Sequence, residues 1–137
     1  MTPGECRPFG WILPRSIPIG HSADSAPDPV VSGTARRSMA EVYLAGAEPT
    51  SPAASPLFAD LRGLPPLMVQ VGTRESLLDD ARRSVDKARA DGVAMTYIEH
   101  ADVIHMWLVF DPEIPESQKA FRLIGEFVRE HILAKTR

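Results

Sequence analysis

The sequence has one cysteine, Cys6, among its 137 residues. A single thiol cannot form an intrachain disulfide, and it excludes a zinc site built from several thiolates. The chain also lacks an apolar run long enough to span a membrane, and prolines interrupt the first twenty residues, where a secretory leader needs an apolar core. We therefore expect no membrane span and a reducing, cytoplasmic location.

Positive charge is not in excess either. Fifteen Lys and Arg stand against 18 Asp and Glu, which gives a net charge of −3 at pH 7. The basic residues are dispersed among acids and form no run, so we expect no nucleic-acid partner. An apolar content of 44% with 24% charged residues is ordinary for a globular domain and indicates no function by itself.

Proline is abundant but unevenly placed, because most of the 13 prolines precede Leu67. Residues 1–29 show no helical or strand periodicity, and the run from Ser22 to Pro29 has the composition of a linker. We expect residues 1–29 to be irregular and poorly ordered, and residues 30–137 to form the structured part.

The structured part alternates strands and helices, which indicates an α/β fold with parallel strands. A short apolar run that ends on Gly72 is typical of a strand buried on both faces. Helices are expected where apolar residues recur every three or four positions between capping residues. The expected elements are a helix from Ser32 to Gly46, a strand over Leu67–Gly72, a helix from Asp79 to about Asp91, a strand over Val93–Glu99 and a helix from Glu116 to about Leu133.

Each expected helix has an apolar face that we assign to the core. These faces are Met39, Val42 and Tyr43 in the first helix, Val85 and Ala88 in the second, and Phe121, Ile124, Val128 and Ile132 in the third.

Glu75 and His105 follow the two expected strands. In an open α/β sheet the loops after successive parallel strands lie at the same edge, so an acid and an imidazole on these loops can converge. A carboxylate that orients an imidazole is the second and third part of a catalytic triad.

The run from Ala54 to Pro66, the Glu75–Asp80 block and the Ile104–His105 pair together resemble the C-terminal part of an α/β-hydrolase esterase of the hormone-sensitive-lipase-like family. The resemblance covers Pro27 to the C-terminus. It implies parallel strands with flanking helices in an incomplete sheet, whose exposed edge favours self-association. It further implies a small-molecule ester substrate, a serine-type acyl-enzyme mechanism, Glu75 as the orienting acid and His105 as the general base.

Two parts of such an enzyme do not appear in the sequence. It has no His-Gly-Gly-Gly run for the oxyanion, and Gly20-His21-Ser22-Ala23-Asp24 has Asp in place of the final Gly of a nucleophile elbow. We therefore expect this chain alone to be a very poor esterase. The alternative is an inactive, truncated relative that acts as an interaction module.

Other polar residues near the pair have competing interpretations. Asp79 and Asp80 suit the first turn of a helix better than catalysis, and His100 matches no family position, so we expect it at the surface. Asp102 stands where the family usually has Gly, and Met106-Trp107 replaces a Gly-aromatic pair, which predicts a bulkier pocket wall. Glu99, His100, Asp102 and His105 lie close enough in sequence to suggest a metal site, but their spacing fits no metal motif. We expect no metal or other cofactor.

Overall fold

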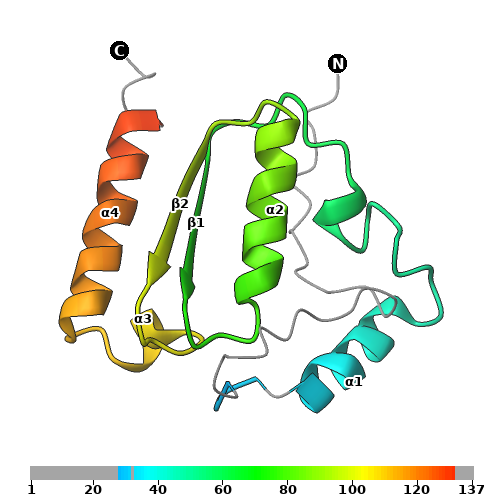
Figure 1. The fold of residues 1–137 in the computed structure, drawn as a ribbon, viewed down its shortest axis with the longest axis horizontal. Coiled ribbons are helices and arrows are strands. Elements are labelled where there is room, and N and C mark those ends of the chain that lie inside the picture. Colours follow the sequence, from blue (N-terminus) through cyan, green and yellow to red (C-terminus); the bar gives the residue numbers. More distant parts are fainter. Residues whose placement is uncertain (1–27, 32, 132–137) are drawn as a thin grey trace.

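The computed structural model describes residues 28–31 and 33–131 (Figure 1). The expected irregular segment, with Cys6 and Ser22, therefore lies outside the described residues except for Asp28 and Pro29. The elements in chain order are α1 (Gly33–Leu44), the 3-10 helix η1 (Pro56–Phe58), β1 (Leu67–Gly72), α2 (Leu78–Ala90), β2 (Met95–His100), α3 (Trp107–Phe110) and α4 (Pro115–His131).

β1 and β2 pair in parallel, with Leu67 opposite Met95 and Gly72 opposite His100. The predicted α/β alternation is thus confirmed. The Leu67 N–H donates to the Ala94 carbonyl at 2.9 Å. Because peptide groups alternate along a strand, those of Met68 and its even-numbered neighbours face away from β2. Within the described ranges β1 pairs with β2 alone, so this side of β1 is an open edge.

α2 and α4 lie on opposite sides of the two strands (Figure 1). α2 begins with Asp79 and Asp80 in its first turn, where negative charge favours the helix dipole, and Gly92 follows it with φ +80°. Val85 and Ala88 are buried, as predicted. Ala88 packs in a cluster with Leu61, Val93 and neighbours at the start of both strands.

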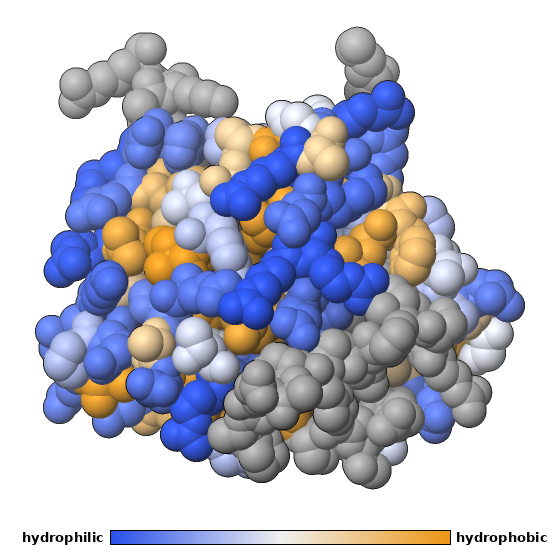
Figure 2. Space-filling model, in the orientation of Figure 1, coloured by the Kyte–Doolittle hydropathy of each residue, from blue (hydrophilic) through white to orange (hydrophobic). Residues whose placement is uncertain are grey.

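α4 turns a different face to the core from the one predicted. Phe121 and Ile124 are 48% and 39% exposed, whereas Ser117 and Ala120 are fully buried. Small residues on this face let the helix pack closely against Trp107. The larger Phe121 and Ile124 then lie on a neighbouring face of the helix and are exposed. Figure 2 shows hydrophobic surface over α4 and the adjoining sheet. The last predicted member of the stripe, Ile132, lies outside the described residues.

The predicted apolar face of α1 is also exposed. Met39 and Val42 are 66% and 81% accessible, and Ala40 is the buried residue of this helix among those whose side chains are described. The helix nevertheless ends as predicted, since Ala45 and Gly46 both adopt positive φ. Periodicity identified the apolar face, but no described element packs over it.

β1 is buried less evenly than its apolar sequence predicts. Val71 and Gly72, at the C-terminal end, are buried, while the four preceding residues are half-buried. In this two-stranded sheet with one helix on each side, only the C-terminal end of β1 is fully covered. Among the described residues, no helix is long and apolar enough to cross a membrane.

Candidate active site

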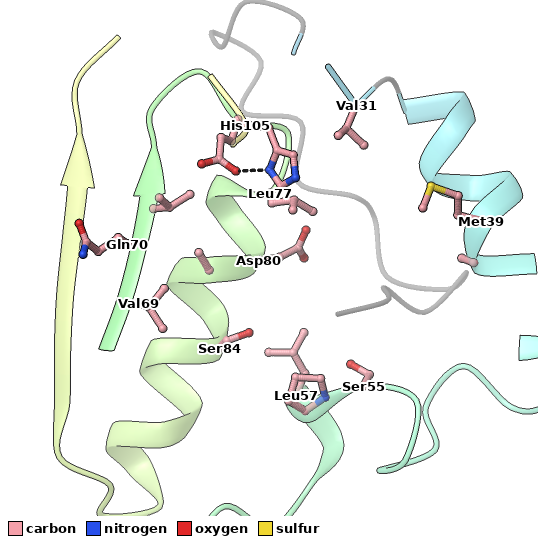
Figure 3. Close-up of a pocket in the computed structure, with 15 residues that line it drawn as sticks. Val31, Met39, Ser55, Leu57, Val69, Gln70, Leu77, Asp80, Ser84 and His105 are labelled. Atoms are coloured by element: carbon pink, nitrogen blue, oxygen red, sulfur yellow. Dashed lines mark hydrogen bonds and ion pairs between the residues drawn. The ribbon is translucent and has the colours of Figure 1, made fainter. Parts of the chain in front are cut away.

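Glu75 and His105 meet at the C-terminal end of the two strands. Glu75 lies on the turn after β1, and His105 lies on the loop between β2 and α3. His105 Nδ1 is 2.7 Å from Glu75 Oε2, the contact drawn as a dashed line in Figure 3. The predicted convergence of these two side chains is confirmed.

The Glu75 carboxylate is held at both of its oxygens. Oε1 accepts the Gly72 N–H at 2.7 Å, and Oε2 faces the imidazole. The Glu75 N–H in turn donates to the Gly72 carbonyl at 3.1 Å, which closes a tight turn directly after the strand. The carboxylate therefore has one position, and that position faces His105.

Gly72 also brings the two loops into contact. A Cβ atom at this position would lie 2.3 Å from the Val103 carbonyl oxygen, far inside van der Waals contact. The same carbonyl accepts the Arg74 N–H at 3.2 Å. Only glycine allows this approach of the histidine loop to the end of β1.

The histidine loop contains two residues in the left-handed region. Asp102 has φ +58° and Met106 has φ +61°. The Asp102 N–H donates to Thr73 Oγ1 at 2.9 Å, which ties this loop to the turn that carries Glu75. Asp tolerates the left-handed region better than most residues, so Asp102 is compatible with a position where the family usually has Gly.

Met106 and Trp107 do not form the predicted pocket wall. Met106 is exposed, and Trp107 is buried against Val103 and Ala120 of the core. Ser117 Oγ donates to the Trp107 carbonyl at 3.3 Å. Trp107 instead anchors the end of the histidine loop to α4, because its indole packs against Ala120 and its carbonyl accepts the Ser117 hydroxyl.

The imidazole and the carboxylate line a pocket of about 490 Å³. The His105 side chain is 26% exposed and that of Glu75 is 6% exposed, so the imidazole is the member of the pair that solvent reaches. The wall is mostly apolar and comes from β1, α1, α2 and the η1 region (Figure 3). Its residues are Val31, Met39, Ala40, Ser55, Pro56, Leu57, Val69, Gln70, Val71, Leu77, Asp80, Ala81 and Ser84.

Residues 14–109 match the family model described as the alpha/beta hydrolase fold. The chain belongs to this family. The α/β-hydrolase chain is 40% identical to an acetyl-hydrolase of Streptomyces hygroscopicus over 109 residues, which is 80% of this chain and 36% of that protein. It is also 40% identical to an esterase of Acinetobacter venetianus over 80 residues, which is 58% of this chain and 26% of that protein.

Solved structures agree with the sequence comparisons. A crystal structure of an esterase from the bacterial hormone-sensitive lipase family superposes with a TM-score of 0.73 at 48% identity, over 77% of this chain and 35% of that one. A hormone-sensitive lipase from a metagenome library gives the same TM-score at 27% identity. The chain thus spans about a quarter to a third of the length of these proteins, and the predicted family is confirmed.

The rival carboxylates Asp79, Asp80 and Asp102 lie at separate places in the fold. Asp79 lies 3.4 Å from Arg82, and Asp80 lies 3.8 Å from Arg83, both within the first turns of α2. Asp80 is buried and lines the pocket, which its position at a helix start did not reveal. Asp102 is exposed on the histidine loop.

The prediction that His100 lies at the surface is wrong. The residue is 4% exposed, its Nε2 lies 2.6 Å from Gln70 Oε1, and its ring centroid lies 5.1 Å from that of Trp107. Burial lowers the pKa of His100, and the positive charge of Lys119 acts in the same direction. The burial of His100 could have been expected from the sequence in one way. Pairing two parallel strands of equal length places Gln70 of β1 near the C-terminal end of β2, where His100 lies.

Three of the four residues of the suggested metal cluster, Glu99, His100 and His105, face different partners. Glu99 accepts hydrogen bonds from Arg82 and Tyr97, and the hydrogen bond from Arg82 holds the pKa of Glu99 below its usual value. His100 faces Gln70, and His105 faces Glu75. No three His, Cys, Asp or Glu side chains of residues 28–31 and 33–131 are grouped to hold a metal ion.

Sequence reasoning missed Asp28, which is buried beside the turn that carries Glu75. Burial opposes its ionisation, but N–H donors from Ser76, Val30 and Val31 outweigh burial and keep the pKa of Asp28 below its usual value. The Asp-Pro pair at residues 28–29 is typical of a local turn. It gives no indication of a hydrogen bond to Ser76, which lies 48 positions further along the chain.

Proposed function

We propose that this chain supplies the acid and the base of a serine-type carboxylic-ester hydrolase, with Glu75 as the orienting acid and His105 as the general base. The 2.7 Å contact between a buried carboxylate and a partly exposed imidazole at the wall of an apolar pocket carries the proposal. The names of the similar proteins, acetyl-hydrolase and esterase, support a small-molecule ester as substrate.

The geometry suits each step of this chemistry. With Nδ1 bonded to Glu75, the neutral imidazole carries its proton on Nδ1 and presents the lone pair of Nε2. Nε2 takes the proton of a serine hydroxyl as that oxygen attacks the ester carbonyl, and then returns the proton to the leaving alcohol. The Glu75 carboxylate stabilises the imidazolium that exists between these two steps.

We further propose that this chain alone is a very poor esterase. Its sequence has no His-Gly-Gly-Gly run and no complete Gly-x-Ser-x-Gly elbow. Loss of the nucleophile removes several powers of ten in rate, and loss of an oxyanion donor costs roughly 3 kcal/mol more. The pair at Glu75 and His105 needs a serine and oxyanion donors from a further polypeptide segment.

The rate at which the purified chain hydrolyses a chromogenic short-chain ester tests the proposal that the chain alone is a very poor esterase. We expect hydrolysis at the background rate, unchanged by His105→Ala and by the control His131→Ala on α4. Turnover that His105→Ala abolishes and His131→Ala leaves intact would refute it. Ser22→Ala would then show whether the serine of the imperfect elbow is the nucleophile.

A chimera tests the role of the pair itself. Residues 28–137 are joined to the preceding part of the 48% identical esterase, which replaces that enzyme's own C-terminal part. We expect ester hydrolysis that falls about a thousandfold or more in His105→Ala, because this removes the general base. Glu75→Gln should also reduce kcat, and His131→Ala should change nothing. Undiminished hydrolysis by the His105→Ala chimera would show that another group is the base.

We also propose two properties that the ester chemistry does not require. The open edge of β1 accommodates a strand of a second copy, since unpaired peptide groups on an edge favour pairing.

The single cysteine favours a cytoplasmic location, which fractionation of the source cells would test.

A further inference from the structure

Asp28 is a buried carboxylate whose described partners are mostly backbone groups. Its Oδ1 accepts the N–H groups of Val30 at 2.9 Å and Val31 at 3.2 Å. Its Oδ2 accepts the N–H of Ser76 at 3.0 Å, across 48 positions of the chain. A carboxylate that receives three backbone donors is fixed in place and remains ionised.

A second hydrogen bond joins the same two segments. Ser76 Oγ donates to the Val31 carbonyl at 3.1 Å. Val31 also lines the pocket, on the wall near His105 (Figure 3). Residues 28–31 are therefore bonded to the residue that directly follows Glu75, and through Val31 they reach the pocket.

On the C-terminal side of the turn that carries Glu75, the Leu78 N–H donates to the Glu75 carbonyl at 3.3 Å. Leu77 is the N-cap residue of α2, and its side chain makes no capping hydrogen bond. On the N-terminal side, the turn is held by the contacts between Gly72 and Glu75. Asp28 accepts the Ser76 N–H, so this peptide is held by a residue from a distant part of the chain.

We infer that Asp28 is a positioning residue for the Glu75–His105 pair, because its carboxylate holds the Ser76 peptide and thereby the turn that aims Glu75 at His105. The inference rests on the proposed function, since it assigns Asp28 a role in that same site. Asp28 does not touch the imidazole in this role; it acts through the backbone next to Glu75.

NMR of the full chain gives a direct readout, because the Gly72 N–H donates to Glu75 Oε1. In Asp28→Ala we expect the Gly72 amide to exchange about tenfold faster or more, the effect of losing a hydrogen bond to a charged group. The ring Nδ1 proton of His105 should broaden or disappear. Amides of the buried Val85 and Ala88 should keep their exchange rates. Asp28→Asn, which retains one acceptor oxygen, should give a smaller effect in the same direction.

Asp60→Ala is the matched control. Asp60 is also a carboxylate that accepts a nearby backbone N–H, that of Arg62, but it is exposed and remote in sequence from the pair. This variant should leave the Gly72 and His105 signals unchanged.

The outcomes separate the inference from the proposed function. Unchanged Gly72 and His105 signals in both Asp28 variants would overturn the inference. Equal loss of protection at Gly72, Val85 and Ala88 would overturn it too, because Asp28 would then stabilise the whole fold. If the wild-type His105 ring proton does not respond to Glu75→Gln, the proposed pairing itself has failed.

Discussion

His100 and His105 lie on the same stretch of chain, yet their partners give them different chemistry. His100 is buried against Trp107 and faces the side-chain amide of Gln70, which carries no charge. His105 is partly exposed and faces a carboxylate. Burial favours the uncharged ring of His100, and its neutral partner does not oppose this. At this scale the partner decides the role of each imidazole, and the residue type alone does not.

The buried imidazole predicts a pH dependence of stability. Burial lowers the pKa of His100 from its usual 6.5, so below about pH 6.5 the unfolded chain binds a proton that the folded chain does not. The free energy of unfolding should therefore fall as the pH falls from 6.5 toward the folded pKa, by at most about 1.4 kcal/mol per pH unit.

Urea unfolding of wild type and His100→Gln at about pH 7.5 and about pH 5.5 checks this expectation. The difference between the two pH values should shrink in His100→Gln. The control Gln118→Ala, at an exposed position of α4 without a titratable side chain, should retain the wild-type difference. An unchanged difference in His100→Gln would mean that another group causes the dependence.

The left-handed backbone at Met106 predicts a second effect at the residue scale. Met106→Val should lower the free energy of unfolding by about 1–2 kcal/mol, because a β-branched side chain is strained at φ +61°. Met39→Val on the exposed side of α1 is the matched control and should cost only about 0.5 kcal/mol of helix propensity. Equal effects in urea unfolding would argue against strain at Met106.

At the scale of elements, the ends of β1 and β2 matter more than their length. Parallel pairing places the turn after β1 beside the loop after β2, and Gly72 lets the two loops touch. Hydrogen bonds from the Asp102 N–H to Thr73 and from the Arg74 N–H to the Val103 carbonyl connect one loop to the other. The candidate site is therefore a property of two strand ends that are held together, and it depends on the absence of a side chain at one position.

Gly72→Ala tests this dependence. The added methyl group meets the Val103 carbonyl, so we expect a loss of about 1–3 kcal/mol in the free energy of unfolding and a weaker Glu75–His105 contact. Gly125→Ala in α4 is the control, because the added Cβ would lie 3.7 Å from the nearest atom, an ordinary contact. This substitution should stabilise the helix by up to about 1 kcal/mol, since alanine has the higher helix propensity. Urea unfolding and the His105 ring proton measure both effects. A stable Gly72→Ala variant with an intact ring proton would contradict the close approach.

For the molecule as a whole, the described part has more apolar surface than its small sheet can cover. Met39, Val42 and Tyr43 on α1 and Phe121 and Ile124 on α4 are all exposed. β1 has an open edge among the described residues, and the chain spans about a third of the length of its esterase relatives. These features agree with our proposals that the site needs a further segment and that the edge of β1 can pair with another strand.

A pair of proline substitutions tests the open edge. Met68→Pro removes a peptide N–H that faces away from β2, so we expect the fold to persist while self-association through this edge weakens. Val69→Pro removes an N–H that faces β2 and should destabilise the sheet by roughly 3 kcal/mol. Sedimentation velocity over a range of concentrations reports association, and circular dichroism reports the fold. Undiminished association in folded Met68→Pro would place the contact on another surface.

The sequence by itself determined both strands, the three longer helices and the meeting of the proposed pair, but not the short η1 and α3. Apolar periodicity, Gly72 and Gly92 placed both strands and α2 nearly where they are, because hydrogen bonding within an element and its caps are local properties of the chain. Loops after successive parallel strands share one edge, so the contact of Glu75 with His105 followed from chain order once the strands were known.

Only the tertiary structure decided which faces and polar groups are buried. The bulky stripe of α4 is exposed and His100 is buried, because burial depends on which element packs alongside and how closely. The bond from Asp28 to Ser76 joins residues 48 positions apart, and a local pattern carries no information on such a distant partner. The catalytic roles of Glu75 and His105 stay predictions, since a reaction also depends on the nucleophile that approaches them.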